Sequence, residues 1–482
     1  MAKIQTFASS TFRSLHIRNY RYYFFGQGVS LCGTWMQTVA LSWLVLDLSH
    51  NSGFAVGLVI ALQFLPTLLF GAWGGVIADR FDKRMVLEAS QSFQAVMAGL
   101  LAVLALSGGI TLWMVYVITF FFGFGQAFDN PARASLAPEL VPPEYVPNAV
   151  GLNSMLFNLA RIVGPAIAGV LIVAVGTGYC FLINAVSFVA VIGALLMMDT
   201  SELRRPVPVA RGKGQIREGF RYIWREPMLR SNLLLMVVVG TLAINFPVIM
   251  PLLARVTFHG NARTYGAMTV AMGVGALVGS LIVAHRSHAT RRLLFVAGLV
   301  FGFAMTGVAL APTLGVAFAI ILVMGAGQMT FMGANNSMVQ LGSDPQMRGR
   351  VMAVYTIAVL GTTPIGGPFI GWLSSVTNPR VSMAVGGIAT VIASAVFVGD
   401  LRLTSRARRA ARAAWESPDP VSRAQESRVT GRWSTAPVVS SATAGTGSGS
   451  ENKNESVVSA GRPVASTTHH DASSAMPFGS VK

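Results

Sequence analysis

Charged residues are scarce in this chain of 482 residues: Asp, Glu, Lys and Arg make up 11% of it, against about 25% in soluble domains. Cysteine is nearly absent, since only Cys32 and Cys180 occur, both inside apolar stretches. These absences exclude an ordinary soluble protein, a disulfide framework and a clustered thiolate metal site. Hydrophobic residues make up 53% of the chain, so we expect it to lie in a lipid bilayer.

Sequence signatures of catalysis are also missing. No run has the form G-x-x-x-x-G-K-[ST], which cradles nucleotide phosphates, so transport driven by ATP is excluded. A His-rich metal cluster, a nucleophile elbow and a pair of acids in an apolar span are absent too, and we therefore predict that the chain is not an enzyme. The N-terminus lacks the apolar core and cleavage site of a signal peptide, so the first apolar stretch is expected to remain as a helix.

Twelve stretches are long and apolar enough to cross a bilayer as helices, which takes about 20 residues each. The predicted fold class is therefore an all-α integral membrane protein with twelve transmembrane helices. The expected spans are 21–47, 54–78, 85–107, 111–130, 149–174, 178–198, 229–254, 264–284, 292–311, 313–338, 350–375 and 380–400.

The formal net charge of +17 raises the alternative of a nucleic-acid partner, but the position of the charges argues against it. Of the 36 Lys and Arg residues, only Arg255, Arg263 and Arg380 fall in predicted outer segments, and Arg161 lies within the fifth span. Cytoplasmic segments of membrane proteins are rich in Lys and Arg. We therefore expect a multi-pass protein of the cell membrane with both termini in the cytoplasm and no nucleic-acid partner.

The second half of the chain repeats the first with a nearly constant shift. The aligned residues are Gly123, Gly125 and Gln126 with Gly325, Gly327 and Gln328, and Gly164, Pro165 and Gly169 with Gly367, Pro368 and Gly371. Two similar six-helix bundles can rock about a site between them and expose it to alternating sides. The expected domains are a cytoplasmic segment 1–20, an N-terminal bundle 21–198, a cytoplasmic linker 199–228, a C-terminal bundle 229–400 and a disordered basic tail 401–482.

The linker contains a short amphipathic pattern. Ile216, Phe220 and Ile223 recur at helical spacing among three arginines. This pattern predicts an interfacial helix at the level of the lipid head groups. Binding of a calmodulin-like protein or of nucleic acid by the same segment is the alternative.

Gly75 to Arg84 reads G-V-I-A-D-R-F-D-K-R and resembles the signature turn between the second and third helices of the major facilitator superfamily. The resemblance covers about residues 15–400. Phe128 to Leu140 looks like the branch of this superfamily that contains bacterial siderophore exporters, enterobactin exporters among them, and macrolide efflux pumps. The fifth span is similar to the superfamily's antiporter motif, although alanine replaces glycine at two of its positions. The motif positions are Gly151, Ala160, Gly164, Pro165 and Gly169.

The resemblance implies a gating motif on the cytoplasmic side, made of Gly75, Asp79, Arg80, Arg84 and Asp129. Gly75 lets its helix approach a neighbour closely, and Asp79 places a carboxylate against the positive N-terminal end of the eleventh helix. Arg80 and Arg84 would then pair with Asp129 and hold the outward-open state closed on the cytoplasmic side. A solvated basic loop without a gating role is the alternative.

Arg161 is the main candidate for the substrate pathway, because an ionised side chain at hydrocarbon depth faces a cavity or a partner. It would contact an anionic substrate or a coupling carboxylate, and structural pairing is the alternative. Other polar residues of the spans are predicted to line the same pathway, although each could instead bond a neighbouring helix. These residues are Gln37, Gln126, Asn158, Asn245, Gln328 and Asn335.

The resemblance implies a monomeric secondary transporter that exports a bulky amphiphilic small molecule, such as a drug or siderophore, in exchange for protons. A pathway rich in Phe and Met fits such a substrate. The expected partners are the lipid bilayer and the substrate, with no cofactor and no metal beyond an ion gradient. Where drug antiporters carry an arginine in the fourth span, this chain has Thr119, so that arginine cannot couple protons. A solute importer and a transporter-like sensor or scaffold remain alternatives.

Overall fold

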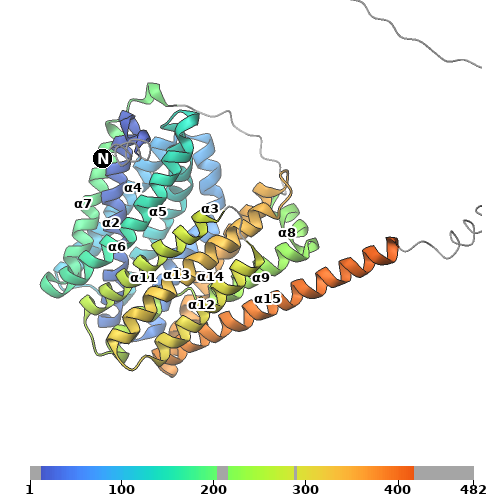
Figure 1. The fold of residues 1–482 in the computed structure, drawn as a ribbon. Helices are drawn as coiled ribbons and strands as arrows, with labels where there is room; N and C mark the ends of the chain where they lie inside the picture. Colours follow the sequence, from blue (N-terminus) through green and yellow to red (C-terminus); the bar gives the residue numbers. More distant parts are fainter. Residues whose placement is uncertain (1–11, 204–214, 287–289, 417–482) are drawn as a thin grey trace, which may run out of the picture. The chain divides into compact units, whose positions relative to one another are not determined.

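The computed structural model describes residues 12–203, 215–286 and 290–416. Within these residues twelve spans are long and apolar enough to cross a membrane, which confirms the predicted number (Figure 1). The N-terminal half contains six of them, each a single helix. They are α2 Arg18–Leu48, α3 Gly53–Arg80, α4 Lys83–Leu106, α5 Leu112–Glu139, α6 Val146–Val175 and α7 Thr177–Leu196.

The C-terminal half follows the same order after a short helix, α8 Gln215–Arg225. In both halves neighbouring helices pack in corresponding pairs, α3 against α5 and α11 against α13, which supports the repeat. The C-terminal elements are α9 Pro227–Leu242, α10 Phe246–Leu252, the π-turn η4 Leu253–Thr257, α11 Ala262–His285, α12 Arg291–Leu310, α13 Leu314–Leu341, α14 Arg348–Val376 and α15 Pro379–Glu416.

The seventh span is interrupted between α9 and α10, whereas the sequence predicted one continuous helix over 229–254. Pro247 at the start of α10 has no backbone N–H and cannot continue the hydrogen-bond ladder of α9. The Asn245 side chain occupies the break, and its Nδ2 donates to the carbonyl oxygen of Thr241 at 2.8 Å. An amide side chain thus satisfies one of the backbone groups that the break exposes.

Two helix ends also differ from the predicted spans. Helix α5 continues beyond residue 130 to Glu139, because its polar residues there are held inside the protein and Leu136 is buried in the N-terminal half. Helix α15 continues beyond residue 400 to Glu416, through a stretch rich in Ala and Arg, which favour helix. The remainder of the predicted tail lies outside the described residues.

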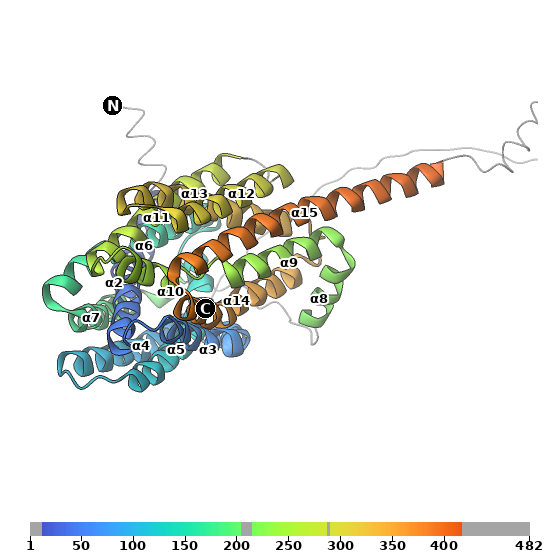
Figure 2. The ribbon, with the colours of Figure 1, turned by 90° about the horizontal axis from the view of Figure 1, so that it is seen from below.

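The molecule has two sides, defined by its helix connections. We call the side with the α3–α4 and α5–α6 connections the basic side and the other the opposite side. Arg80, Lys83 and Arg84 lie on the basic side, as the predicted charge pattern requires. Helix α8 also packs there, against α14 and α9 (Figure 2).

Candidate transport pathway

The two halves meet closely at the opposite side. Gly53 and Gly57 of α3 touch the backbone of α14 at Gly371 and Gly367, so a Cβ atom at either α3 position would collide with a carbonyl group. Helices α6 and α11 approach similarly. The Asp47 carboxylate at the end of α2 forms an ion pair with Arg255, which links the two halves at this side. Small residues and the Asp47–Arg255 ion pair therefore close the opposite side.

Toward the basic side the same helices separate. Gly71 lies on the α14-facing side of α3, yet a Cβ there would come within 4 Å only of Thr67 in its own helix. Gly151 lies on the α11-facing side of α6, and a Cβ there would meet no atom of the described residues within 4 Å. Both interfaces between the halves thus open in one direction, and the carrier is open to its basic side.

Arg161 lies about halfway along α6, just where the two halves begin to separate. The neighbouring Ile162 packs against Gly273 of α11, since a Cβ at Gly273 would lie 2.8 Å from the Ile162 side chain. Arg161 is half-buried, and its guanidinium carbon lies 5.8 Å from the centroid of the Trp35 ring of α2. Among the described residues it has no ion pair or hydrogen bond, so its donors remain open to a ligand.

Helix α5 carries a polar network inside the N-terminal half. The buried carboxylate of Asp129 accepts a hydrogen bond of 2.5 Å from Gln91 of α4 and forms an ion pair with Arg133, one turn along α5. The hydroxyl of Tyr23 on α2 is buried nearby and has no hydrogen-bond partner among the described residues. Gln126 and Arg133 lie on the same side of α5, and each is half-buried. A cation, a carboxylate and spare donors are thus held together.

The gating motif is only partly assembled in this conformation. Asp79 and Arg80 are exposed, and Gly75 is half-buried. Arg84 Nε donates to Glu88 at 2.7 Å rather than to Asp129, which pairs with Arg133 instead. The predicted Arg80 and Arg84 pairing with Asp129 belongs to the outward-open state and stays a prediction for that state.

The antiporter motif acts here as a packing surface. Gly164 brings α6 against the α2 backbone, with a Cβ position 2.7 Å from a carbonyl oxygen, and Gly169 brings it against α11. Ala160 and Pro165 are buried between these contacts, while Gly151 faces open space. The motif therefore positions α6, and with it Arg161, between the two halves.

Other predicted pathway residues are bonded inside one half. Gln37 accepts a hydrogen bond of 2.7 Å from Asn184 of α7, so it joins two helices of the N-terminal half and does not face the pathway. Asn245 lies in the helix break and is buried. Asn158 is half-buried and bonds the Ser154 carbonyl at 2.8 Å.

Gln328 and Asn335 of α13 are both buried, unlike Gln126 at the corresponding place in α5. Asn335 Nδ2 donates to the carbonyl oxygen of Asn232 on α9 at 3.3 Å. The Gln328 Oε1 atom has no partner among the described residues. The polar side chains Gln328 and Asn335 of the C-terminal half are therefore buried, whereas Gln126 and Arg133 at the corresponding places in α5 are partly exposed.

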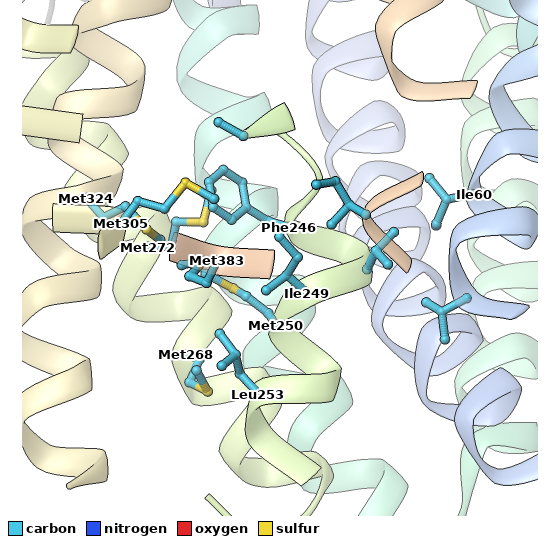
Figure 3. Packing of buried hydrophobic residues seen from close by; sticks show 14 of the residues in the cluster. Ile60, Phe246, Ile249, Met250, Leu253, Met268, Met272, Met305, Met324 and Met383 are labelled. Carbon is cyan, nitrogen blue, oxygen red and sulfur yellow. The ribbon is translucent and has the colours of Figure 1, made fainter. Parts of the chain in front are cut away.

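Many methionines of the C-terminal half lie in its core and not along a pathway. Six methionines there are at most 3% exposed, one of them within α10 and five on the helices around it (Figure 3). They fill the space around Phe246 and Ile249 and belong to one hydrophobic core. Flexible thioethers fit the irregular surface that a broken helix leaves. The methionines are Met250, Met268, Met272, Met305, Met324 and Met383.

Sequence reasoning did not find Trp35, Tyr23 and Gln91. Trp35 is aromatic within an apolar span, and no spacing rule connects it to Arg161. Gln91 and Tyr23 lie on helices whose mutual rotation the sequence does not state. The one available signal was the presence of polar side chains in α2 and α4 at membrane depth.

Two pseudo-equivalent bundles that meet at one side and separate at the other, with Arg161 at the place where they begin to separate, define an alternating-access transporter of the major facilitator type. The chain belongs to one family of that superfamily: the model described as transmembrane secretion effector matches residues 9–429. This match confirms the predicted superfamily.

Characterised relatives lie in the predicted branch. The chain is 23% identical over 382 residues to the staphyloferrin A transporter of Staphylococcus aureus, covering 78% of this chain and 95% of the relative. It is 26% identical over 355 residues to macrolide efflux protein A of Streptococcus pyogenes, covering 71% and 85%. It is 27% identical over 346 residues to the multidrug efflux pump Tap of Mycolicibacterium fortuitum, covering 69% and 84%. All three are transporters.

Solved structures confirm the fold. An inward-facing bacterial homologue of the human lysosomal transporter Spinster aligns with a TM-score of 0.65 at 18% identity, covering 80% of this chain and 96% of that one. An inward-facing bacterial homologue of the iron transporter ferroportin gives a TM-score of 0.62 at 16% identity, covering 80% and 98%. The chain is thus a multi-pass membrane transporter of the major facilitator superfamily.

Proposed function

We propose that this transporter exports a bulky amphiphilic molecule with an anionic group across the cell membrane, in exchange for protons, as a monomer with both termini in the cytoplasm. The relatives named as efflux pumps and as a siderophore transporter support export. The distribution of Lys and Arg supports the cytoplasmic placement of the basic side.

The observation that carries the proposal is the free guanidinium of Arg161. A cation without an ion pair at hydrocarbon depth is costly unless it serves a ligand. Trp35 covers one side of the cation, which offers an aromatic surface beside the charge. An amphiphile with an anionic group and an apolar body matches this pair, since the anion binds Arg161 and the body lies against Trp35 and Phe157, whose rings are 5.6 Å apart.

Asp129 is the group proposed to carry the coupling proton. It is 1% exposed and lies on the half of α5 nearest the basic side, where the carrier is open. Protonation removes its negative charge and so weakens its ion pair with Arg133. The freed Arg133 could then rearrange as the halves move. This assigns the proton step to α5 and the substrate step to α6.

Inside-out membrane vesicles test the proposal. With an acidic lumen, the wild-type carrier is expected to accumulate an anionic fluorescent amphiphile, and a protonophore should abolish the accumulation. Arg161→Ala should lower flux of the anionic probe about tenfold or more, because hydrogen bonds to a charged group contribute about 1.5–3 kcal/mol. Arg161→Lys should keep part of it.

Thr363→Ala is the matched control, because Thr363 of α14 is adjacent to Pro364, the residue that corresponds to Arg161 in the repeat, and its flux should stay near wild type. Equal flux for Arg161→Ala would remove Arg161 from the pathway. Accumulation only in right-side-out vesicles would establish an importer. If no probe were transported and deletion of residues 405–482 still changed the behaviour of the cell, the alternative of a transporter-like sensor or scaffold would be favoured.

A further inference from the structure

Helix α8 is fixed to the C-terminal half through one of its faces. Ile223 is 1% exposed, and a Cβ at Gly219 would lie 2.8 Å from the carbonyl oxygen of Arg350, at the start of α14. Glu218 forms an ion pair with Arg350 at 2.7 Å. The helix therefore moves with the basic-side end of α14, one of the helices that separate in the open carrier.

The other faces of α8 form two stripes without a protein partner in the described structure. Ile216, Phe220 and Trp224 follow one another at four-residue steps, and each is 49% exposed. The Phe220 and Trp224 rings stack with centroids 5.4 Å apart. Such an apolar stripe is unfavourable in water, so it indicates an apolar environment.

The second stripe is basic and runs directly beside the apolar one. Arg217, Arg221 and Arg225 each follow one of the three apolar residues, and all are exposed. Within the described residues none of these arginines forms an ion pair, and Glu218, the acid within this helix, is already paired with Arg350. The stripe is therefore an uncompensated array of three guanidinium groups.

We propose that α8 binds the surface of a bilayer leaflet that contains anionic phospholipid, and that the three arginines bind its phosphates. Guanidinium groups match phosphate geometry, and polybasic segments are attracted to anionic leaflets. The stripe of Ile216, Phe220 and Trp224 lies at the boundary of the acyl chains, as in other interfacial helices. Lipid composition thereby acts on α14 through Gly219 and Glu218.

The structure favours lipid over the two macromolecular partners that a basic helix could bind. A protein that wraps an amphipathic helix needs access to most of its circumference, but the Gly219 and Ile223 face of α8 is already covered by the carrier. Nucleic acid would satisfy the arginines and leave the apolar stripe in water. A bilayer surface covers both stripes at once, and the inference is independent of the direction of transport.

The experiment uses the full-length carrier with Cys32→Ser and Cys180→Ser, and an environment-sensitive fluorophore attached through Ile216→Cys. It is placed in nanodiscs of phosphatidylcholine, with and without about 30% phosphatidylglycerol. Anionic lipid is expected to shift the emission to the blue and raise its intensity about twofold or more. High salt should reduce this response, because it screens the charges.

Arg217→Gln with Arg221→Gln and Arg225→Gln should abolish the response to phosphatidylglycerol. Arg291→Gln with Arg292→Gln, which removes exposed arginines from the same side of the carrier, should leave the response unchanged. Equal emission in the two lipid mixtures, at low and at high salt, would overturn the proposal without any further variant. So would a blue shift produced in detergent by an RNA oligonucleotide or an acidic peptide but not by phosphatidylglycerol.

Discussion

The two halves of the carrier share a topology but bury different chemistry at the same place. In the N-terminal half, Gly125 of α5 packs against Gln94 of α4. In the C-terminal half, Gly327 of α13 packs against Phe301 of α12. These two contacts correspond in the repeat, and they fix the equivalence of the residues around them.

One turn from this contact the halves diverge. In the N-terminal half, Asp129 accepts a hydrogen bond from Gln91 and pairs with Arg133. In the C-terminal half, Phe331 corresponds to Asp129 and packs against Gly298, where a Cβ atom would lie 3.4 Å from the Phe331 ring. The backbone thus accommodates either an ionic network or an aromatic ring. A duplicated fold can therefore concentrate charge in one half and keep the other as an apolar support against which it moves.

The largest effect is expected when the C-terminal chemistry is transferred to the N-terminal half. Gln91→Gly with Asp129→Phe reproduces the Phe331 and Gly298 pair but leaves Arg133 without its carboxylate. Breaking a buried ion pair costs about 3–5 kcal/mol, and somewhat less here because Arg133 keeps partial exposure. Thermal unfolding in detergent should show a marked loss of stability.

Adding Arg133→Asn completes the transfer, because Asn335 occupies the corresponding place. This triple variant should regain most of the lost stability, since no charge is left buried without a partner. Its flux should no longer respond to a pH gradient, because Asp129 and Arg133 are both gone. A triple variant that is stable and still driven by protons would remove this network from coupling.

The sequence contains enough to predict the spans, the repeat and the basic side, because each depends on composition averaged over many residues. The break in the seventh span depends on one proline, Pro247, and on an asparagine two residues before it. Hydropathy averaged over a whole span does not register such a local change, so the interruption was missed.

Side-chain roles were harder to predict than spans, as Gln37 and Gln126 illustrate. Both are glutamines at membrane depth, yet Gln37 is buried and bonds Asn184 inside one half, whereas Gln126 of α5 is half-buried. The difference follows from how each helix is rotated against its neighbours, which is tertiary information. Arg161 was identified because a charge at that depth is unusual wherever it points.

A smaller effect is expected when the hydrogen bond between Gln37 and Asn184 is removed, because this bond joins two helices inside the N-terminal half. Gln37→Ala and Asn184→Ala should each destabilise the carrier by about 1 kcal/mol, as hydrogen bonds between membrane helices do. The double variant should cost little more than either single variant, since both remove the same bond. Substrate affinity in binding titrations should be unchanged, and a changed affinity would return Gln37 to the pathway.

The smallest effect is expected in the methionine core of the C-terminal half. Met272→Leu and Met305→Leu keep volume and polarity close to the original, so each should change stability by less than about 1.5 kcal/mol. The range of transported substrates should stay the same, because both side chains are at most 3% exposed and touch no substrate. Gln126→Ala, which removes a half-buried side chain of α5 that the sequence predicts to line the pathway, is the control that should alter the apparent substrate affinity. If the methionine variants instead changed selectivity, the C-terminal half would have to open its core during transport, and the division of labour between the halves would fail.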